Sequence, residues 1–123
     1  MVIFDANMIL RYLLNDNEEM ADIAEDYIEK GTVSVTIEVI AEVVYVLKGV
    51  YSLERNEISE IVKNFLKLVS CRDLDILNIA FDAYQEYSLD FIDCVLYAYN
   101  EVRGNEIATF DKKLLSLIKR ESR

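Results

Sequence analysis

The stretch MVIFDAN, residues 1–7, opens the chain and decides how the rest of it is interpreted. Residues 2–4 form an apolar run without polar alternation, which is typical of a strand buried on both faces in a parallel sheet. Residues 6–14 then follow a helical pattern. Asp5 is therefore expected at the carboxyl end of a first strand, where open α/β sheets hold their ligands. Taken alone, an Asp at this place is more often the N-cap of the following helix.

Hydrophobic periodicity along the remaining chain alternates between helix and strand. The expected helices cover residues 18–30, 37–49, 52–69, 75–87, 88–103 and 111–119, and the expected strands cover residues 32–36, 70–74 and 106–109. Strands separated by helices imply βαβ units with right-handed crossovers. We therefore expect an α/β fold, a three-layer α/β/α sandwich around a central parallel sheet of four strands, with five strands as the alternative.

The composition favours one compact domain over residues 1–123. The chain of 123 residues is 53% hydrophobic, contains no Pro and has only three Gly, so no linker is expected. No apolar run approaches the ~20 residues of a membrane span, and no signal peptide is recognisable. We expect a cytoplasmic protein without a membrane partner. Cys71 and Cys94 have no metal-ligand spacing and are interpreted as small buried hydrophobic residues.

The chain contains no His, so any catalysis must rest on other groups. This excludes the Ser-His-Asp arrangement and most zinc and copper sites. Asp and Glu number 23 against 13 Lys and Arg, which gives a formal net charge of −10. Such a balance opposes nonspecific attraction to nucleic acid. A nucleic-acid substrate would need local basic residues or cations, and a solubilising surface is the simpler explanation for much of the acidic excess.

Five acids fall where this fold would bring side chains to one edge of the sheet. Asp5 and Asp111 each follow an expected strand, with a helix cap as the alternative. Glu42 lies within an expected helix among apolar neighbours, with a solvated charge as the alternative. Asp90 and Asp93 open another helix, and the pair resembles a capping box. Capping accounts for Asp90 more completely than for Asp93, which has apolar sequence on both sides.

Together these acids predict a metal site. Carboxylates within a few ångströms of one another repel, which raises their pKa values or recruits a cation. Mg²⁺ and Mn²⁺ prefer oxygen ligands and suit a site without His. One or two such ions activate water and stabilise the leaving oxygen in phosphodiester hydrolysis. The sequence therefore favours a carboxylate-based, metal-dependent hydrolase.

Over nearly its whole length the chain resembles PIN-domain ribonucleases, most closely the VapC-type toxins of bacterial and archaeal toxin–antitoxin pairs. Four motifs carry the resemblance: VIFDAN at residues 2–7, residues 36–47 around Glu42, DFIDCVL at residues 90–96, and ATFDKKL at residues 108–114. Each motif is weak alone, but four in this order form a fairly specific pattern. The family commonly adds a fifth strand after the last helix, where this sequence ends with residues 121–123.

The resemblance implies an endoribonuclease that depends on Mg²⁺ or Mn²⁺, forms a homodimer and is neutralised by a small antitoxin protein. It also implies the following roles: catalytic acids Asp5, Glu42, Asp93 and Asp111, of which Asp5, Asp93 and Asp111 bind metal, with Asp90, Asn7 and Thr109 as accessory residues. Arg11, Lys48, Lys112 and Lys113 are candidates for contacts to RNA phosphates that offset the negative charge.

Other functions fit the sequence less well. A haloacid-dehalogenase-like phosphatase would have Asp at position 7, which is Asn here, and a receiver domain would have an early acidic pair, which is missing. No Gly-rich turn follows a strand, which argues against nucleotide binding. Two alternatives stay open. The chain could be a non-catalytic domain that binds a basic partner in an acidic groove, or a PIN nuclease that processes RNA without an antitoxin.

Overall fold

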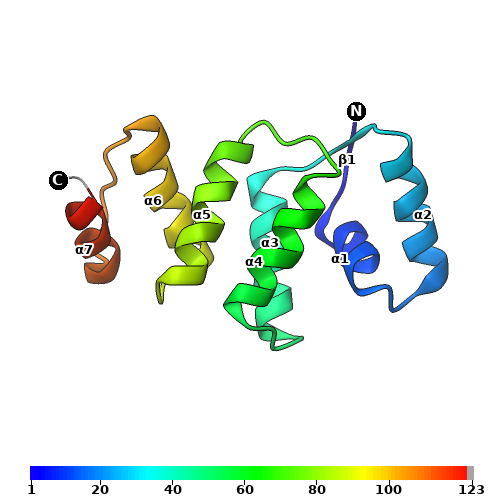
Figure 1. Ribbon diagram of the computed structural model, residues 1–123, viewed down its shortest axis with the longest axis horizontal. Helices are drawn as coiled ribbons and strands as arrows, with labels where there is room; N and C mark the ends of the chain where they lie inside the picture. The colour runs from blue at the N-terminus through cyan, green and yellow to red at the C-terminus, as the bar shows by residue number, and fades with distance from the viewer. Residues whose placement is uncertain (122–123) are drawn as a thin grey trace. The chain divides into compact units, whose positions relative to one another are not determined.

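The computed structural model describes residues 1–121, which form two compact units (Figure 1). Unit 1 comprises Met1–Asp73 and unit 2 comprises Leu74–Arg123. Each unit buries its own set of apolar side chains. No helix among the described residues is both long and apolar enough to cross a membrane.

Unit 1 contains a small parallel sheet at the place that the opening stretch predicts. Strand β1 (Val2–Ile3) pairs with β2 (Val33–Ser34) in parallel, with Val2 opposite Val33. A single parallel bridge joins Ser34 to Ser70, so the third expected strand is reduced to one residue. The first βαβ unit is confirmed, although both of its strands are shorter than expected.

The sheet of four strands is not confirmed. Among the described residues the sheet has two strands, and residues 104–111, which include the expected strand 106–109, form neither helix nor strand. A segment becomes a strand only when neighbouring backbone satisfies its N–H and C=O groups, and the sequence does not encode which neighbour is present. A fifth strand would follow residue 121 and lies outside the described residues.

Four helices complete unit 1: α1 (Ala6–Leu14), α2 (Glu18–Glu29), α3 (Ile37–Gly49) and α4 (Arg55–Leu66). The start of α3 is as predicted, because the Thr36 side chain accepts a hydrogen bond from the N–H of Val39 at 3.3 Å. Helix α4 is shorter than the expected helix 52–69. Ser52 has a left-handed φ of 55°, which a continuous helix does not allow, and Glu57 accepts from the N–H of Glu54 at 3.0 Å.

The core of unit 1 lies between α1, α3 and α4. Ile9 of α1, Ile40 and Val43 of α3 and Ile58 of α4 are completely buried. Helix α1 also packs on α2, which contributes only the small residues Ala21 and Ala24 to the buried set. Helix α1, which Asp5 precedes, therefore packs against both α2 and α3.

Unit 2 consists of α5 (Leu74–Glu86), α6 (Phe91–Arg103) and α7 (Lys112–Glu121). Helices α5 and α6 lie side by side (Figure 1). At one end of the pair, Arg103 of α6 makes two hydrogen bonds to the Asp75 carboxylate of α5, at 2.5 and 3.1 Å. At the other end, the Phe91 ring packs on Phe81 and Tyr84. The two helices therefore run in opposite directions.

Two details of unit 2 bear on the sequence predictions. Helix α6 ends as predicted, because Gly104 adopts a left-handed φ of 73° directly after Arg103. It begins later than the expected residue 88, because Asp90 is extended and forms the N-cap.

The prediction for Cys94 is confirmed, since that side chain is buried in α6. The prediction for Cys71 in unit 1 is wrong, because that residue is only half-buried.

Candidate functional site

Unit 2 carries an open groove of about 300 Å³ that contains three carboxylates, which we call the acid groove. It is formed where the turn between α5 and α6 meets the first turns of α6 and α7. The groove is lined by Ser88, Leu89, Asp90, Asp93, Asp111, Lys112 and Lys113. The structure thus brings together Asp90, Asp93 and Asp111, which the sequence analysis selected from two separate motifs.

Asp90 and Asp93 enter the groove from the start of α6. Asp90 is the N-cap, yet its side chain makes no capping hydrogen bond. The capping-box interpretation is therefore wrong for this pair, and the Asp90 carboxylate is not used by its own helix. Asp93 lies in the first turn, where the partial positive charge of the helix N-terminus favours an acid.

Asp93 is an acid of the groove whose pKa is shifted by its surroundings. Its side chain is half-buried, whereas Asp90 and Asp111 are exposed. Partial burial, followed by the negative charges of Asp111 and Asp90, raises the pKa of the Asp93 carboxyl above its usual range. All three causes disfavour the charged form, and the attraction of a bound cation would oppose them. The acid groove therefore favours a positive ligand beside Asp93.

Asp111 reaches the groove from a turn that its own backbone stabilises. The Asp111 N–H donates to Thr109 Oγ1 at 3.0 Å, and Asp111 Oδ1 accepts from the N–H of Leu114 at 2.8 Å. The capping alternative for Asp111 is confirmed, but it uses one oxygen. The second oxygen, Oδ2, takes no part in the cap, so capping and metal binding are compatible. Thr109 positions Asp111 rather than lining the groove.

Asp5 and Glu42 belong to unit 1. Asp5 follows β1, and its Oδ1 accepts from the N–H of Met8 at 2.9 Å, so it caps α1 as the capping alternative predicts. Glu42 lies on α3 next to the buried Val43, and its own side chain is exposed, as is that of Asn7. Because Glu42 is exposed despite its apolar neighbours, the structure does not confirm that it is shielded from solvent.

The four candidate cations have different environments. Lys112 and Lys113 line the acid groove, and Lys48 is exposed in the last turn of α3. Arg11 is half-buried, and its Nη1 contacts Asp16 Oδ2 at 2.9 Å. Arg11 therefore supports the end of α1, and binding a phosphate there would require it to leave or share Asp16.

Sequence reasoning missed the hydroxyl-bearing residues beside the groove. Ser88 lines the acid groove, and Tyr87 and Ser116 line an adjoining hollow. Ser88 was expected in a helix, and it lies in the α5–α6 turn instead. The sequence offers one hint of these residues, the pair Tyr87-Ser88 directly before Leu89-Asp90. This hint becomes informative only when α7 is known to pack beside the α5–α6 turn.

The donor chemistry of the acid groove fits a hard divalent cation. Carboxylate oxygens are the ligands that Mg²⁺ and Mn²⁺ prefer, and such ions commonly need only one or two of them. Within the part of the chain that the structure describes, no three Asp, Glu or Cys side chains converge closely enough to hold a metal as a preformed cluster.

The model of the PIN domain family matches residues 2–119, which covers both units and all four motifs. The chain belongs to the PIN domain family. PIN domains are generally nucleases, and they typically use divalent metals. A comparison with curated proteins gave no significant match, and neither did a comparison with solved structures. The family therefore supports a nuclease, and the acid groove is where this PIN domain gathers three of its five candidate acids.

Proposed function

We propose that this PIN domain is an endoribonuclease that hydrolyses RNA phosphodiester bonds with the help of Mg²⁺ or Mn²⁺. The observation that carries the proposal is the acid groove, in which Asp93 is half-buried and has a raised pKa beside Asp90 and Asp111. A carboxylate destabilised in this way gains most from a cation. A nuclease site needs such a cation to approach a polyanionic substrate with a chain of net charge −10.

On the resemblance of the motifs, we propose Asp5, Asp93 and Asp111 as the residues that would hold the ion. The bound ion supplies Lewis-acid stabilisation of the phosphate oxygens and of the leaving oxygen. Asp5 and Asp111 each cap a helix through Oδ1, which fixes the direction of the carboxylate and leaves Oδ2 for the ion. Each cap therefore holds its carboxylate in place relative to its own helix.

Glu42 and the accessory residues act on water and substrate. Glu42 takes a proton from the attacking water, or binds the ion through water. Attack of this water on phosphorus breaks the bond to the leaving oxygen, which takes up a proton. Asp90 adds negative charge beside Asp93, while Asn7 and Thr109 orient water or phosphate, and Lys48, Lys112 and Lys113 contact neighbouring phosphates.

We further propose that the protein is the VapC-like toxin of a toxin–antitoxin pair and acts in the cytoplasm as a homodimer. The proposal rests on the resemblance of the four motifs and on exposed apolar residues such as Tyr45 of α3, which is 77% exposed. Expression of the chain alone should arrest bacterial growth. Co-expression of the adjacent small reading frame should relieve the arrest, and an arrest that no neighbour relieves would favour RNA processing without an antitoxin.

Cleavage of structured RNA by the purified protein tests the nuclease. Wild type should cleave with Mg²⁺ or Mn²⁺ and stop when a chelator is added. Asp5→Asn and Asp93→Asn should each lower the rate by about 100-fold or more, because each removes a negatively charged ligand of the ion that would stabilise the transition state. Glu60→Gln is the matched control, since Glu60 is an exposed acid of α4 outside the proposed site.

Two outcomes would contradict the nuclease. Cleavage that continues in the chelator would exclude the metal, and full activity of both aspartate variants would exclude the acidic site. No cleavage across a broad panel of RNAs, together with binding of a basic partner, would instead favour the non-catalytic acidic-groove domain.

A further inference from the structure

A second hollow, of about 400 Å³, adjoins the acid groove, and we call it the lysine groove. Its walls come from the α5–α6 turn and from the first turns of α7. They include Tyr87, Ser88 and Leu89 on one side and Lys112, Lys113 and Ser116 on the other. The acid groove shares Ser88, Leu89 and both lysines with it, so the two hollows adjoin each other within unit 2.

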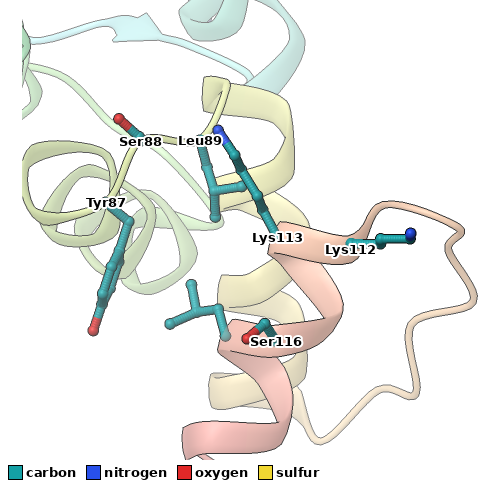
Figure 2. Close-up of a pocket in the computed structure, with 7 residues that line it drawn as sticks. Tyr87, Ser88, Leu89, Lys112, Lys113 and Ser116 are labelled. Carbon is teal, nitrogen blue, oxygen red and sulfur yellow. The ribbon is translucent and has the colours of Figure 1, made fainter.

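The lysine groove combines an apolar floor with a cation and hydroxyls. Leu89 is 5% exposed and Leu117, which also lines the groove, is 4% exposed. Figure 2 shows Lys113 extended along Leu89 toward Ser88, whereas Lys112 points away from the other lining residues. Ser116 projects from α7, and the Tyr87 ring stands on the opposite side. Lys113 is therefore the lysine that serves this groove.

These surfaces match the parts of a nucleotide. Bases stack on aromatic and apolar side chains, and phosphates bind lysine ammonium groups and hydroxyls. The volume of about 400 Å³ lies in the usual range of roughly 300–1,000 Å³ for small-ligand pockets. The free N–H groups of a helix start are not the reason for this match, because Asp111 already caps α7 through Leu114.

We propose that the lysine groove binds one nucleotide of a single-stranded RNA next to the bond that is cut. Lys113 and Ser88 hold its phosphate, and its base lies against Tyr87 and the Leu89–Leu117 floor. This inference rests on the proposed nuclease function and adds a binding subsite to it. A strand entering the acid groove meets three carboxylates, and Lys113 supplies the opposite charge at the adjoining end. The lysine groove therefore determines on which side of the acid groove the RNA strand lies.

Binding of a short, fluorescently labelled, 2′-O-methylated single-stranded RNA tests the subsite, because this probe resists cleavage. Anisotropy is measured with the full chain in a chelator over a series of salt concentrations. Lys113→Gln should weaken binding by about tenfold, because it removes a charge-assisted contact. It should also reduce the slope of log K against log salt by about 0.7. Lys119→Gln is the matched control on α7, since Lys119 is exposed and does not line the groove.

A second variant tests the shape of the groove. Ser116→Trp fills the hollow and keeps its charge, so it should weaken binding by about tenfold without changing the salt slope. Far-UV circular dichroism confirms that each variant is folded. The subsite is overturned if wild type does not bind the RNA, if Lys113→Gln and Ser116→Trp bind as wild type does, or if Lys119→Gln loses the same slope.

Cleavage assays separate this inference from the nuclease proposal. If wild type binds RNA through Lys113 and cleaves none, the nuclease proposal fails and the subsite stands. If wild type cleaves RNA and the groove variants bind and cleave equally well, the subsite fails and the nuclease proposal stands. Competition by an acidic peptide as strong as that by the RNA would show that the groove recognises charge alone, which overturns the nucleotide assignment.

Discussion

Phe91 connects the acid groove to the packing of α5 against α6, and we expect its truncation to weaken both. The side chain is 6% exposed, and its ring lies 4.6 Å from the Phe81 ring and 5.7 Å from the Tyr84 ring, measured between centroids. It is the first residue of α6, between Asp90 and Asp93 in the sequence. Its position sets where that end of α6 lies.

The packing gives the magnitude. Phe→Ala substitutions in cores cost about 3–5 kcal/mol, and aromatic pairs contribute about 0.5–1.5 kcal/mol beyond their buried area. We therefore expect Phe91→Ala to lower the free energy of unfolding by about 4 kcal/mol. Domains are commonly stable by only about 5–15 kcal/mol, so this is a large fraction. Phe91→Leu, which refills most of the volume, should cost about 1 kcal/mol.

Urea unfolding followed by far-UV circular dichroism measures the change in both variants. The neighbouring Ile92 is the matched control, because it is apolar but 54% exposed, and Ile92→Ala should change stability by less than about 0.5 kcal/mol. RNA cleavage by Phe91→Ala should fall more than its folded fraction, since a misplacement of about 1 Å in a site can cost about 100-fold. A loss of stability below about 1 kcal/mol in Phe91→Ala, or an equal loss in Ile92→Ala, would show that the Phe91 ring does not hold α6 against α5.

Three further predictions concern single residues. The folded-state pKa of Asp93 is raised, so its ionisation destabilises the fold as the pH rises. Asp93→Asn should therefore unfold at a higher urea concentration than wild type at neutral pH. This difference in urea midpoint should vanish in acid, below the pKa of Asp93 in the unfolded chain. Asp111→Ala should cost about 1 kcal/mol by removing the N-cap that Leu114 donates to, while Asp111→Asn should keep the stability, and both should lose cleavage activity. Gly104→Ala should cost about 1 kcal/mol because φ is 73° there, whereas Gly49→Ala, at the helical end of α3, should not destabilise; thermal unfolding of the pair checks both.

The features that depend only on residues close together in the chain could be predicted from the sequence. The starts of α1 and α3 and the end of α6 are as predicted, because each depends on a side chain or glycine within one helical turn. The apolar run before Asp5 likewise predicted a parallel strand, and β1 pairs with β2 as expected. The expected burial of this strand on both faces is wrong, because Val2 and Ile3 are both exposed. The absence of His excluded imidazole-based chemistry before any contact was known.

Tertiary structure decided which candidates differ from ordinary caps. Asp5, Asp90 and Asp111 all precede helices, yet Asp90 alone among these three makes no capping hydrogen bond. The pKa of Asp93 is raised first by its partial burial and then by the charges of Asp111 and Asp90, and no local pattern encodes that burial or the approach of Asp111. The lysine groove likewise depends on contacts between distant segments, because Tyr87 directly follows α5 whereas Ser116 lies on α7. Local hydrogen bonds determine where the helices begin and end. Contacts between distant segments determine which charged side chains lie together and where the grooves form.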